Sequence, residues 1–81
     1  MQISPTPSDS LANLPRGETA FFLAFNAGRE SAGRLTSLGF TPGAPISMLQ
    51  NYGKGPLVVS VRGARVALGR EEAVKIVVRK D

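Results

Sequence analysis

Apolar residues recur at every second position through much of the C-terminal half of the chain, which is the spacing of half-buried β-strands. In the run 57–62 this alternation turns Leu57, Val59 and Val61 toward one side. The aromatic run 19–25 also favours a strand, because it is short and lies between turn residues. Five strands are predicted in all. Four lie at 19–25, 45–50, 57–62 and 74–79, and the other contains Val66 and Leu68 and runs back along the strand at 57–62.

One stretch has the spacing of an amphipathic helix instead. Across 29–38 the apolar residues Ala32, Leu35 and Leu38 recur at threes, which places them along one narrow side. Gly33 weakens the helix by about 1 kcal/mol relative to alanine. The helix is therefore expected to depend on packing against the rest of the domain.

The end of this helix is marked by clear turn residues. Gly39 predicts a left-handed cap, after which Phe40 is placed to fold back on Leu35 in a Schellman motif. Pro42 and Gly43 then occupy the second and third positions of a four-residue turn, as a type II turn requires. The chain is expected to reverse sharply here.

Two further local structures follow from turn and capping residues. Gly63 at the first central position of a two-residue hairpin favours a type II′ turn. Before the first strand, Leu11 and Leu14 have the spacing of one helical turn, and either Asp9 or Ser10 is placed to cap it. Both leucines are expected to pack down onto the core.

Together these elements predict a mainly β domain, with one helix inserted after the first strand and a single helical turn at 69–73 before the last. In a chain of 81 residues, five short strands protect their edges best by curling into a small barrel, and an SH3-like barrel is the natural candidate. The domain is expected to span 11–79. The Pro- and Ser-containing segment 1–10 reads as a flexible lead.

The net charge of +4 is not spread evenly. Up to Gly53 three basic residues balance three acidic ones, whereas from Lys54 onward seven basic residues accompany three acidic ones. This excess suits attraction to an acidic protein, an anionic lipid or nucleic acid, or forms an ordinary solvated face. Neither a span of about 18 apolar residues nor a signal-peptide pattern occurs, so a cytoplasmic location is expected.

The residue types that most catalysis needs are missing. The chain contains no histidine and no cysteine, which removes the commonest general base, the thiol nucleophile and the preferred transition-metal ligands. The segment Gly53-Lys54-Gly55 lacks the spacing of a phosphate-binding P-loop. We therefore expect no enzyme, no catalytic residue, no metal site and no bound cofactor.

Four motifs carry a resemblance to a known family. They are L-x-x-L-P-x-G-E at 11–18, R-L-x-x-L-G-F-x-P-G at 34–43, V-x-V-R-G-x-R-V-A-L at 59–68 and E-E-A-x-x-I-x-V at 71–78. Together they resemble the FeoA family, small cytoplasmic SH3-like proteins of bacterial ferrous iron uptake. The second motif is the most specific of the four.

The resemblance implies an accessory protein that acts by protein–protein contact with FeoB, the membrane Fe(II) transporter with a cytoplasmic G domain. The resemblance implies no catalytic residue and no small-molecule substrate. The same kind of domain ends some iron-dependent repressors as an SH3-like module. The short N-terminal lead leaves no room for a winged-helix reader, so a free-standing FeoA-like protein is the better match.

Two surfaces are candidates for contact with this partner. A short helix that stops in a rigid Pro-Gly turn presents a preorganised, partly apolar corner, which lowers the ordering cost of association. Its residues are Arg34, Leu38, Gly39, Phe40, Pro42 and Gly43. The second surface suits an acidic partner and comprises Lys54, Arg62 and Arg65, beside the Gly-rich connection and the hairpin. For Arg34 and Phe40 the sequence leaves two alternatives, a contact with the partner or a structural role in the domain itself.

Two other functions stay open at this point. A nucleic-acid-binding barrel would use the positive charge, although the aromatic residues lie in the neutral half of the sequence. A metal-responsive module would be related to the repressor domains, with only oxygen ligands to offer. The oligomeric state and the direction of any effect on the transporter have no signature in the sequence.

Overall fold

The computed structural model describes residues 8–26 and 28–80. Strands make up most of the regular structure, and each helix is short. In chain order the elements are β1 (Ser8–Ser10), η1, a 3-10 helix (Leu11–Asn13), β2 (Thr19–Phe25), α1 (Arg29–Ser37), β3 (Pro45–Gln50), β4 (Leu57–Val61), β5 (Ala64–Leu68), α2 (Arg70–Ala73) and β6 (Ile76–Arg79).

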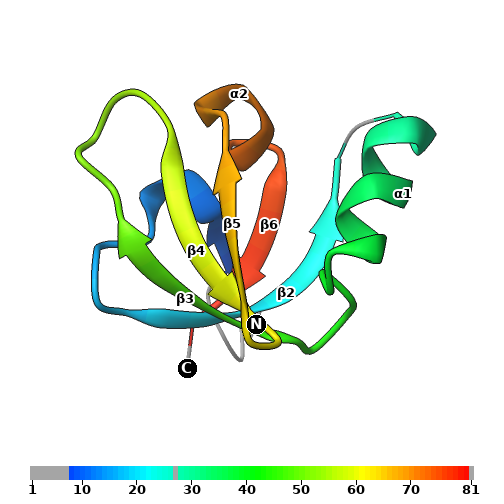
Figure 1. Cartoon of the computed structure of the whole chain (residues 1–81), viewed down its shortest axis with the longest axis horizontal. Coiled ribbons are helices and arrows are strands. Elements are labelled where there is room, and N and C mark those ends of the chain that lie inside the picture. The colour runs from blue at the N-terminus through cyan, green and yellow to red at the C-terminus, as the bar shows by residue number, and fades with distance from the viewer. Residues whose placement is uncertain (1–7, 27, 81) are drawn as a thin grey trace, which may run out of the picture.

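The strands form one antiparallel sheet that curls into a partly closed barrel (Figure 1). Their order across the sheet is β1-β6-β2-β3-β4-β5, so the last strand of the chain lies between the first two. The edge strands β1 and β5 are only three and five residues long, which limits the backbone groups open to unwanted pairing. The predicted mainly β architecture, with its helix after the strand at 19–25, is confirmed.

The sheet has six strands rather than the predicted five. Ser8–Ser10, expected within a flexible lead at 1–10, form β1 and pair antiparallel with Val77–Arg79 of β6. Residues 1–7 of that lead lie outside the described residues. β1 was missed because its three residues are all polar and carry no alternation of apolar and polar positions.

The helical turn before β2 is formed and capped by Ser10. The Ser10 hydroxyl accepts a hydrogen bond from the Ala12 N–H at 3.2 Å, which satisfies a backbone donor at the start of η1. Leu11 and Leu14 are both buried, as predicted. The other candidate cap, Asp9, instead accepts hydrogen bonds from the Ser10 N–H at 2.7 Å and from the Asn13 side chain at 3.0 Å.

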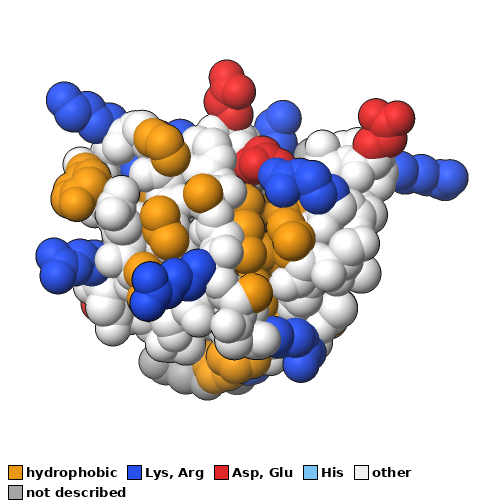
Figure 2. Space-filling view, in the orientation of Figure 1, with side chains coloured by type: hydrophobic (Ala, Val, Ile, Leu, Met, Phe, Trp, Pro, Cys, Tyr) orange, Lys and Arg blue, Asp and Glu red, His pale blue; other side chains and the backbone are white. Residues whose placement is uncertain are grey.

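Charged side chains project from the outside of the barrel (Figure 2). Within residues 8–26 and 28–80, no charged or polar residue is buried. A core without ionisable groups avoids the cost of removing charge from water. The charged side chains of the described residues therefore lie at or near the surface of the domain.

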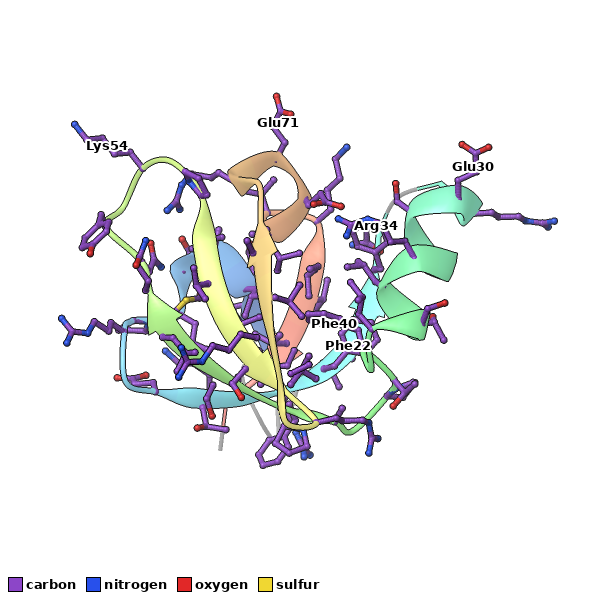
Figure 3. The ribbon with its side chains drawn as sticks, viewed as in Figure 1. Phe22, Glu30, Arg34, Phe40, Lys54 and Glu71 are labelled. Atoms are coloured by element: carbon purple, nitrogen blue, oxygen red, sulfur yellow. The ribbon has the colours of Figure 1, made fainter. Side chains whose placement is uncertain are left out.

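α1 stands at one side of the barrel and is attached to it by few residues (Figure 3). Leu35 is its only buried residue, and Leu38 just beyond its end is half-buried against the core. Ala32, predicted on the same buried side, is only partly covered. The helix ends at Ser37, one residue before the predicted position.

The end of α1 has the predicted Schellman geometry. The Phe40 N–H donates to the Leu35 carbonyl at 3.0 Å, and the Gly39 N–H donates to the Thr36 carbonyl at 3.0 Å. Gly39 has φ +109°, in the region that favours glycine. These bonds satisfy carbonyls that the helix end would otherwise leave unpaired.

The β4–β5 hairpin turns one residue earlier than predicted. Val61 pairs with Ala64, so the two loop residues are Arg62 and Gly63, not Gly63 and Ala64. Both have positive φ, +49° and +83°, which makes the turn type I′ rather than type II′. Type I′ turns match the right-handed twist of the strands, and here the turn sets Val59 opposite its apolar partner on β5.

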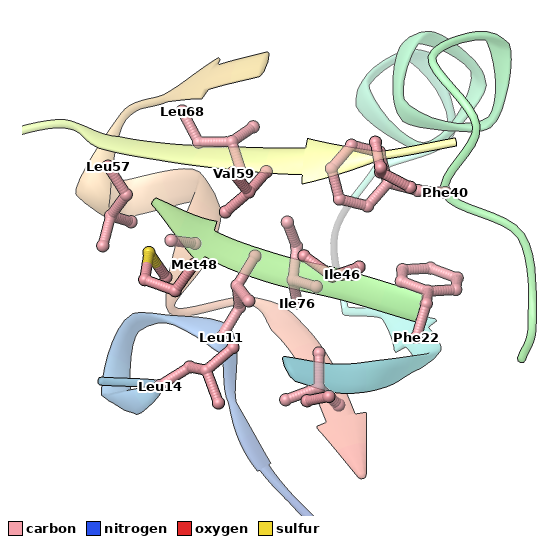
Figure 4. Packing of buried hydrophobic residues seen from close by; sticks show 14 of the residues in the cluster. Leu11, Leu14, Phe22, Phe40, Ile46, Met48, Leu57, Val59, Leu68 and Ile76 are labelled. Atoms are coloured by element: carbon pink, nitrogen blue, oxygen red, sulfur yellow. The ribbon is translucent and has the colours of Figure 1, made fainter. Parts of the chain in front are cut away.

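The core is a single apolar cluster inside the barrel (Figure 4). The predicted inward residues of β3 to β6 are all buried: Ile46, Met48, Leu57, Val59, Val61, Val66, Leu68, Ile76 and Val78. On β2, Phe22 points inward, while Phe21 and Phe25 are half-buried. Burying one such large apolar side chain stabilises the fold by about 1.5–3 kcal/mol.

Candidate partner-binding surface

The turn after α1 is fixed on both sides by backbone hydrogen bonds. The Ala44 N–H donates to the Thr41 carbonyl at 2.9 Å and Gly43 has φ +86°, which completes the predicted type II turn. The Gly43 N–H also donates to the Phe22 carbonyl at 2.8 Å, and the Phe22 N–H donates to the Ala44 carbonyl at 2.9 Å. The exposed Pro42 is thereby held in one place relative to the barrel.

Phe40 lies beneath this turn rather than on its surface. Its side chain is 1% exposed, and its ring meets Phe22 edge to face, with centroids 6.0 Å apart and planes at 69° (Figure 3). Aromatic pairs attract in this arrangement. Phe40 therefore supports the turn from the core, whereas the neighbouring Leu38 is half-buried and reaches the surface.

Arg62 joins the helix end, although sequence reasoning had placed it with Lys54. Its Nε donates to the Gly39 carbonyl at 3.3 Å, and its Nη2 donates to the Thr41 hydroxyl at 2.9 Å. The hairpin is thus tied to the turn after α1. We call Leu38, Gly39, Thr41, Pro42, Gly43 and Arg62 the corner surface.

Arg34 is engaged in an ion pair beside the corner surface. Its Nη2 lies 2.6 Å from Oε2 of Glu72 on α2, with the two side chains 50% and 28% exposed. Because solvent screens such a pair, its contribution to stability is at most about 1 kcal/mol. The pair fixes one side of α1 to α2, and a partner reaching Arg34 meets a charge that is already neutralised.

The structure divides the second predicted surface. Lys54 lies in the connection before β4, whereas Arg62 and Arg65 lie at the hairpin after it (Figures 1 and 3). The five residues of β4 separate them by roughly 15 Å at 3.3 Å per residue. All three side chains are exposed, but they do not form one patch.

Sequence reasoning missed the partners of both arginines. Glu72 pairs with Arg34 across 38 positions, and Thr41 accepts from Arg62 across 21. No local pattern signals such pairs, since they arise only when the barrel brings α2 and the hairpin beside α1. The tertiary fold, not the motif, defines these contacts.

In the part of the chain that the structure describes, there is no detectable pocket and no group of three or more acidic side chains close enough to share a metal ion. No helix of this part is long and apolar enough to cross a membrane. The corner surface is rigid and partly apolar, and it carries one guanidinium group, that of Arg62.

Comparison with known families and proteins gives consistent matches. The family model of the FeoA domain matches residues 10–80. A protein of Methanocaldococcus jannaschii, provisionally named Fe(2+) transport protein A, is 34% identical over 68 residues, which cover 84% of this chain and 82% of that protein.

Solved structures agree with these matches. An iron uptake regulatory protein, FeoA, is 32% identical with a TM-score of 0.83, over 90% of this chain and 97% of that one. FeoA of Stenotrophomonas maltophilia, solved with zinc and described as a procaryotic SH3 domain protein, is 34% identical with a TM-score of 0.76, over 85% and 87% of the two chains. The predicted SH3-like fold is thereby confirmed.

A manganese-dependent transcriptional repressor shares the fold alone. It is 22% identical to this chain with a TM-score of 0.85, and the match spans 99% of this chain but 45% of the repressor. The shared part is thus a module of a larger protein. The likeness shows a common barrel and carries no metal site over to this chain.

Proposed function

Because this chain belongs to the FeoA family, we propose that it is an accessory protein of bacterial ferrous iron uptake that contacts a FeoB-like membrane transporter. The contact is made from the cytoplasm, with the transporter's G domain and adjoining cytoplasmic segments. The protein has no small-molecule substrate, performs no catalysis, and reaches the membrane only through its partner.

One observation carries the proposal beyond family membership, namely the rigidity of the corner surface. Its backbone is bonded to β2 through Gly43 and to the hairpin through Arg62. A surface that is already ordered loses little conformational freedom on binding, so more of the contact energy appears as affinity. Such a feature suits a protein that acts by contact with a partner.

The size of the molecule also fits one or two protein contacts. Its accessible surface is 5104 Å². A standard interface takes about 800 Å² from each partner. One interface would therefore cover about a sixth of the surface, which is enough for the corner surface and its surroundings.

The test is binding to the cytoplasmic part of the FeoB encoded in the same genome, measured by biolayer interferometry. The variants are Arg62→Ala and, as a matched control on the same hairpin, Arg65→Ala. We expect Arg62→Ala to weaken binding about tenfold or more, equivalent to about 1.4 kcal/mol, and Arg65→Ala to leave it within twofold. Thermal unfolding of both variants checks that the barrel persists.

A second measurement addresses the physiological role. Deleting the gene should lower uptake of radioactive Fe(II) by anaerobic cells, and the wild-type gene should restore it. Normal Fe(II) uptake in the deletion strain, together with no binding of the FeoB cytoplasmic part, would refute the proposed function.

A further inference from the structure

The connection between β3 and β4, residues 51–56, is locked at its start by one side chain. The Asn51 amide donates to the carbonyls of Ala12 at 3.1 Å and Leu14 at 2.9 Å. Its oxygen accepts from the Gly53 N–H at 3.0 Å, which bends the chain in an Asx-type turn. The connection is therefore joined to η1 at its base.

A second side chain locks the other end of the same connection. Arg70 of α2 donates through Nε to the Gly55 carbonyl at 3.1 Å and through Nη2 to the Asn51 oxygen at 2.8 Å. Its Nη1 approaches the Ala12 carbonyl at 3.5 Å. Two side chains thus hold 51–56 from both ends, although it contains no regular structure.

The residues between these anchors point into solvent. Tyr52 is 72% exposed, the most of any large hydrophobic residue in the described part of the chain, and Lys54, two positions further on, is also exposed. A tyrosine loses few degrees of freedom on binding and is enriched among the residues that dominate interface energy. A rigid loop that holds an exposed tyrosine is the arrangement expected of a docking surface.

Exposed cations flank this loop, and the exposed carboxylates nearest in sequence to Arg16 and Arg70 are those of Glu18 and Glu71. Arg16 is exposed on the adjacent turn, which is held against the end of β3 because the Gly17 N–H donates to the Met48 carbonyl at 2.8 Å. Figure 2 shows Lys and Arg side chains beside hydrophobic ones at the Lys54 end, while the prominent acidic side chains project from α2 and α1. Glu71 and Glu30 mark those acidic positions in Figure 3.

We propose that Tyr52, Lys54 and Arg16 form a second docking surface that takes an acidic protein segment with a pocket for the tyrosine ring. The inference rests on the proposed function, and it assigns this acidic segment to the cytoplasmic part of the same transporter. The surface lies at the opposite end of β4 from the corner surface. One molecule then holds its partner at two separate places.

A protein partner fits this surface better than single-stranded nucleic acid. Proteins that bind single strands stack successive bases on several exposed aromatic side chains. Here Tyr52 is the only exposed aromatic residue among those described, since Phe22 and Phe40 are buried and Phe21 and Phe25 are half-buried. One ring and two cations suffice for a contact between proteins.

The experiment measures binding of the full chain to the FeoB cytoplasmic part at 50 and 300 mM salt. The variants are Tyr52→Ala and Lys54→Glu, with Val74→Ala and Lys75→Glu as matched controls at exposed positions between α2 and β6. We expect Tyr52→Ala to weaken binding about tenfold or more. Lys54→Glu should weaken it at 50 mM and much less at 300 mM, because salt screens exposed charges. The controls should stay within twofold.

The outcomes separate this inference from the proposed function. Wild-type binding that is unchanged in both Tyr52→Ala and Lys54→Glu overturns the second docking surface and leaves the transporter contact standing. If Arg62→Ala loses binding and Tyr52→Ala does not, the second docking surface is likewise overturned and the transporter contact stands. Absence of wild-type binding overturns the second docking surface, and together with normal Fe(II) uptake in the deletion strain it refutes the proposed function as well. Tight binding of a fluorescent single-stranded RNA, lost in Tyr52→Ala, overturns the protein partner in favour of nucleic acid.

Discussion

The side chain of Arg62 crosses from the β4–β5 hairpin to the end of α1 and donates from Nε to the Gly39 carbonyl at 3.3 Å. Both residues have positive φ, which is common for glycine and rare for arginine. Gly39 needs its positive φ, and a Cβ there would lie in tight contact with the Arg62 side chain, 3.2 Å from its Cδ. Arg62 has a positive φ of its own, +49°, without being glycine. The contact places two backbone positions with positive φ side by side.

Replacing Gly39 should therefore destabilise the domain, whereas the same change within α1 should not. Gly39→Ala forces an alanine to φ +109° and against Arg62, at an expected loss of about 1–3 kcal/mol in the free energy of unfolding. Gly33→Ala, where a Cβ meets nothing within 4 Å, should add about 0.5–1 kcal/mol. Urea unfolding of both variants measures the two changes, and equal effects would contradict the geometry.

Substitutions of Arg62 should separate its side-chain bonds from its backbone strain. Arg62→Ala removes the bonds to Gly39 and Thr41 but keeps a residue that disfavours positive φ. Arg62→Asn also removes them, yet asparagine before Gly63 is preferred in type I′ turns. We expect Arg62→Ala to be the less stable variant by about 0.5–1 kcal/mol. Thermal unfolding compares them; a more stable alanine variant would argue against the observed turn.

The Arg34–Glu72 pair should fix α1 more than it stabilises the fold. A double-mutant cycle with Arg34→Met and Glu72→Gln should give a coupling of about 0.2–1 kcal/mol that shrinks at high salt. Amide hydrogen exchange in α1 should quicken in either single variant, because only Leu35 otherwise buries the helix. Unchanged exchange in α1 would show that the helix is held by packing alone.

Acid stability should depend partly on Asp9. The hydrogen bond from the Asn13 side chain, followed by that from the Ser10 N–H, holds the pKa of Asp9 below its ordinary value. A lowered folded-state pKa means stability that is present above the ordinary value, about 3.9, and lost as pH falls through the folded value. Asp9→Asn should therefore flatten the loss of stability below about pH 4.

The measurement is the urea midpoint of the wild type and of Asp9→Asn between pH 2 and 6. Glu71→Gln is the control, because it changes an exposed carboxylate on α2. If the two variants have the same pH profile, the hydrogen bonds of Asp9 have no role in acid stability.

Local rules anticipated the helix end but not the hairpin. Gly39 and Gly43 permit the positive φ that the helix cap and the turn require, and Pro42 fixes its own φ, so the geometry here follows from residue type. At the hairpin, both Arg62-Gly63 and Gly63-Ala64 are compatible with the alternation of apolar residues, since both keep Val59 and Val66 inward. The choice depends on the twist of the strands and on the contacts of Arg62, which are properties of the folded chain.

The candidate site was predictable to a smaller degree. Its position at the end of α1 follows from the motif at 34–43, but its composition does not. Burial of Phe40 and the arrival of Arg62 both result from the closing of the barrel. The anchored loop at 51–56 shows the same limit, because nothing in its Gly-rich sequence indicates that Arg70, 15 residues from Gly55 and 19 from Asn51, bonds to it.

The shallow attachment of α1 bears on how this protein can diversify. Since Leu35 is the only buried residue of the helix, substitutions at its exposed positions leave the core of the barrel intact. A helix that tolerates substitution and leads into the corner surface can follow sequence changes in a partner while the scaffold stays constant. α1 is thus the part of the domain where partner specificity can evolve at the lowest risk to folding.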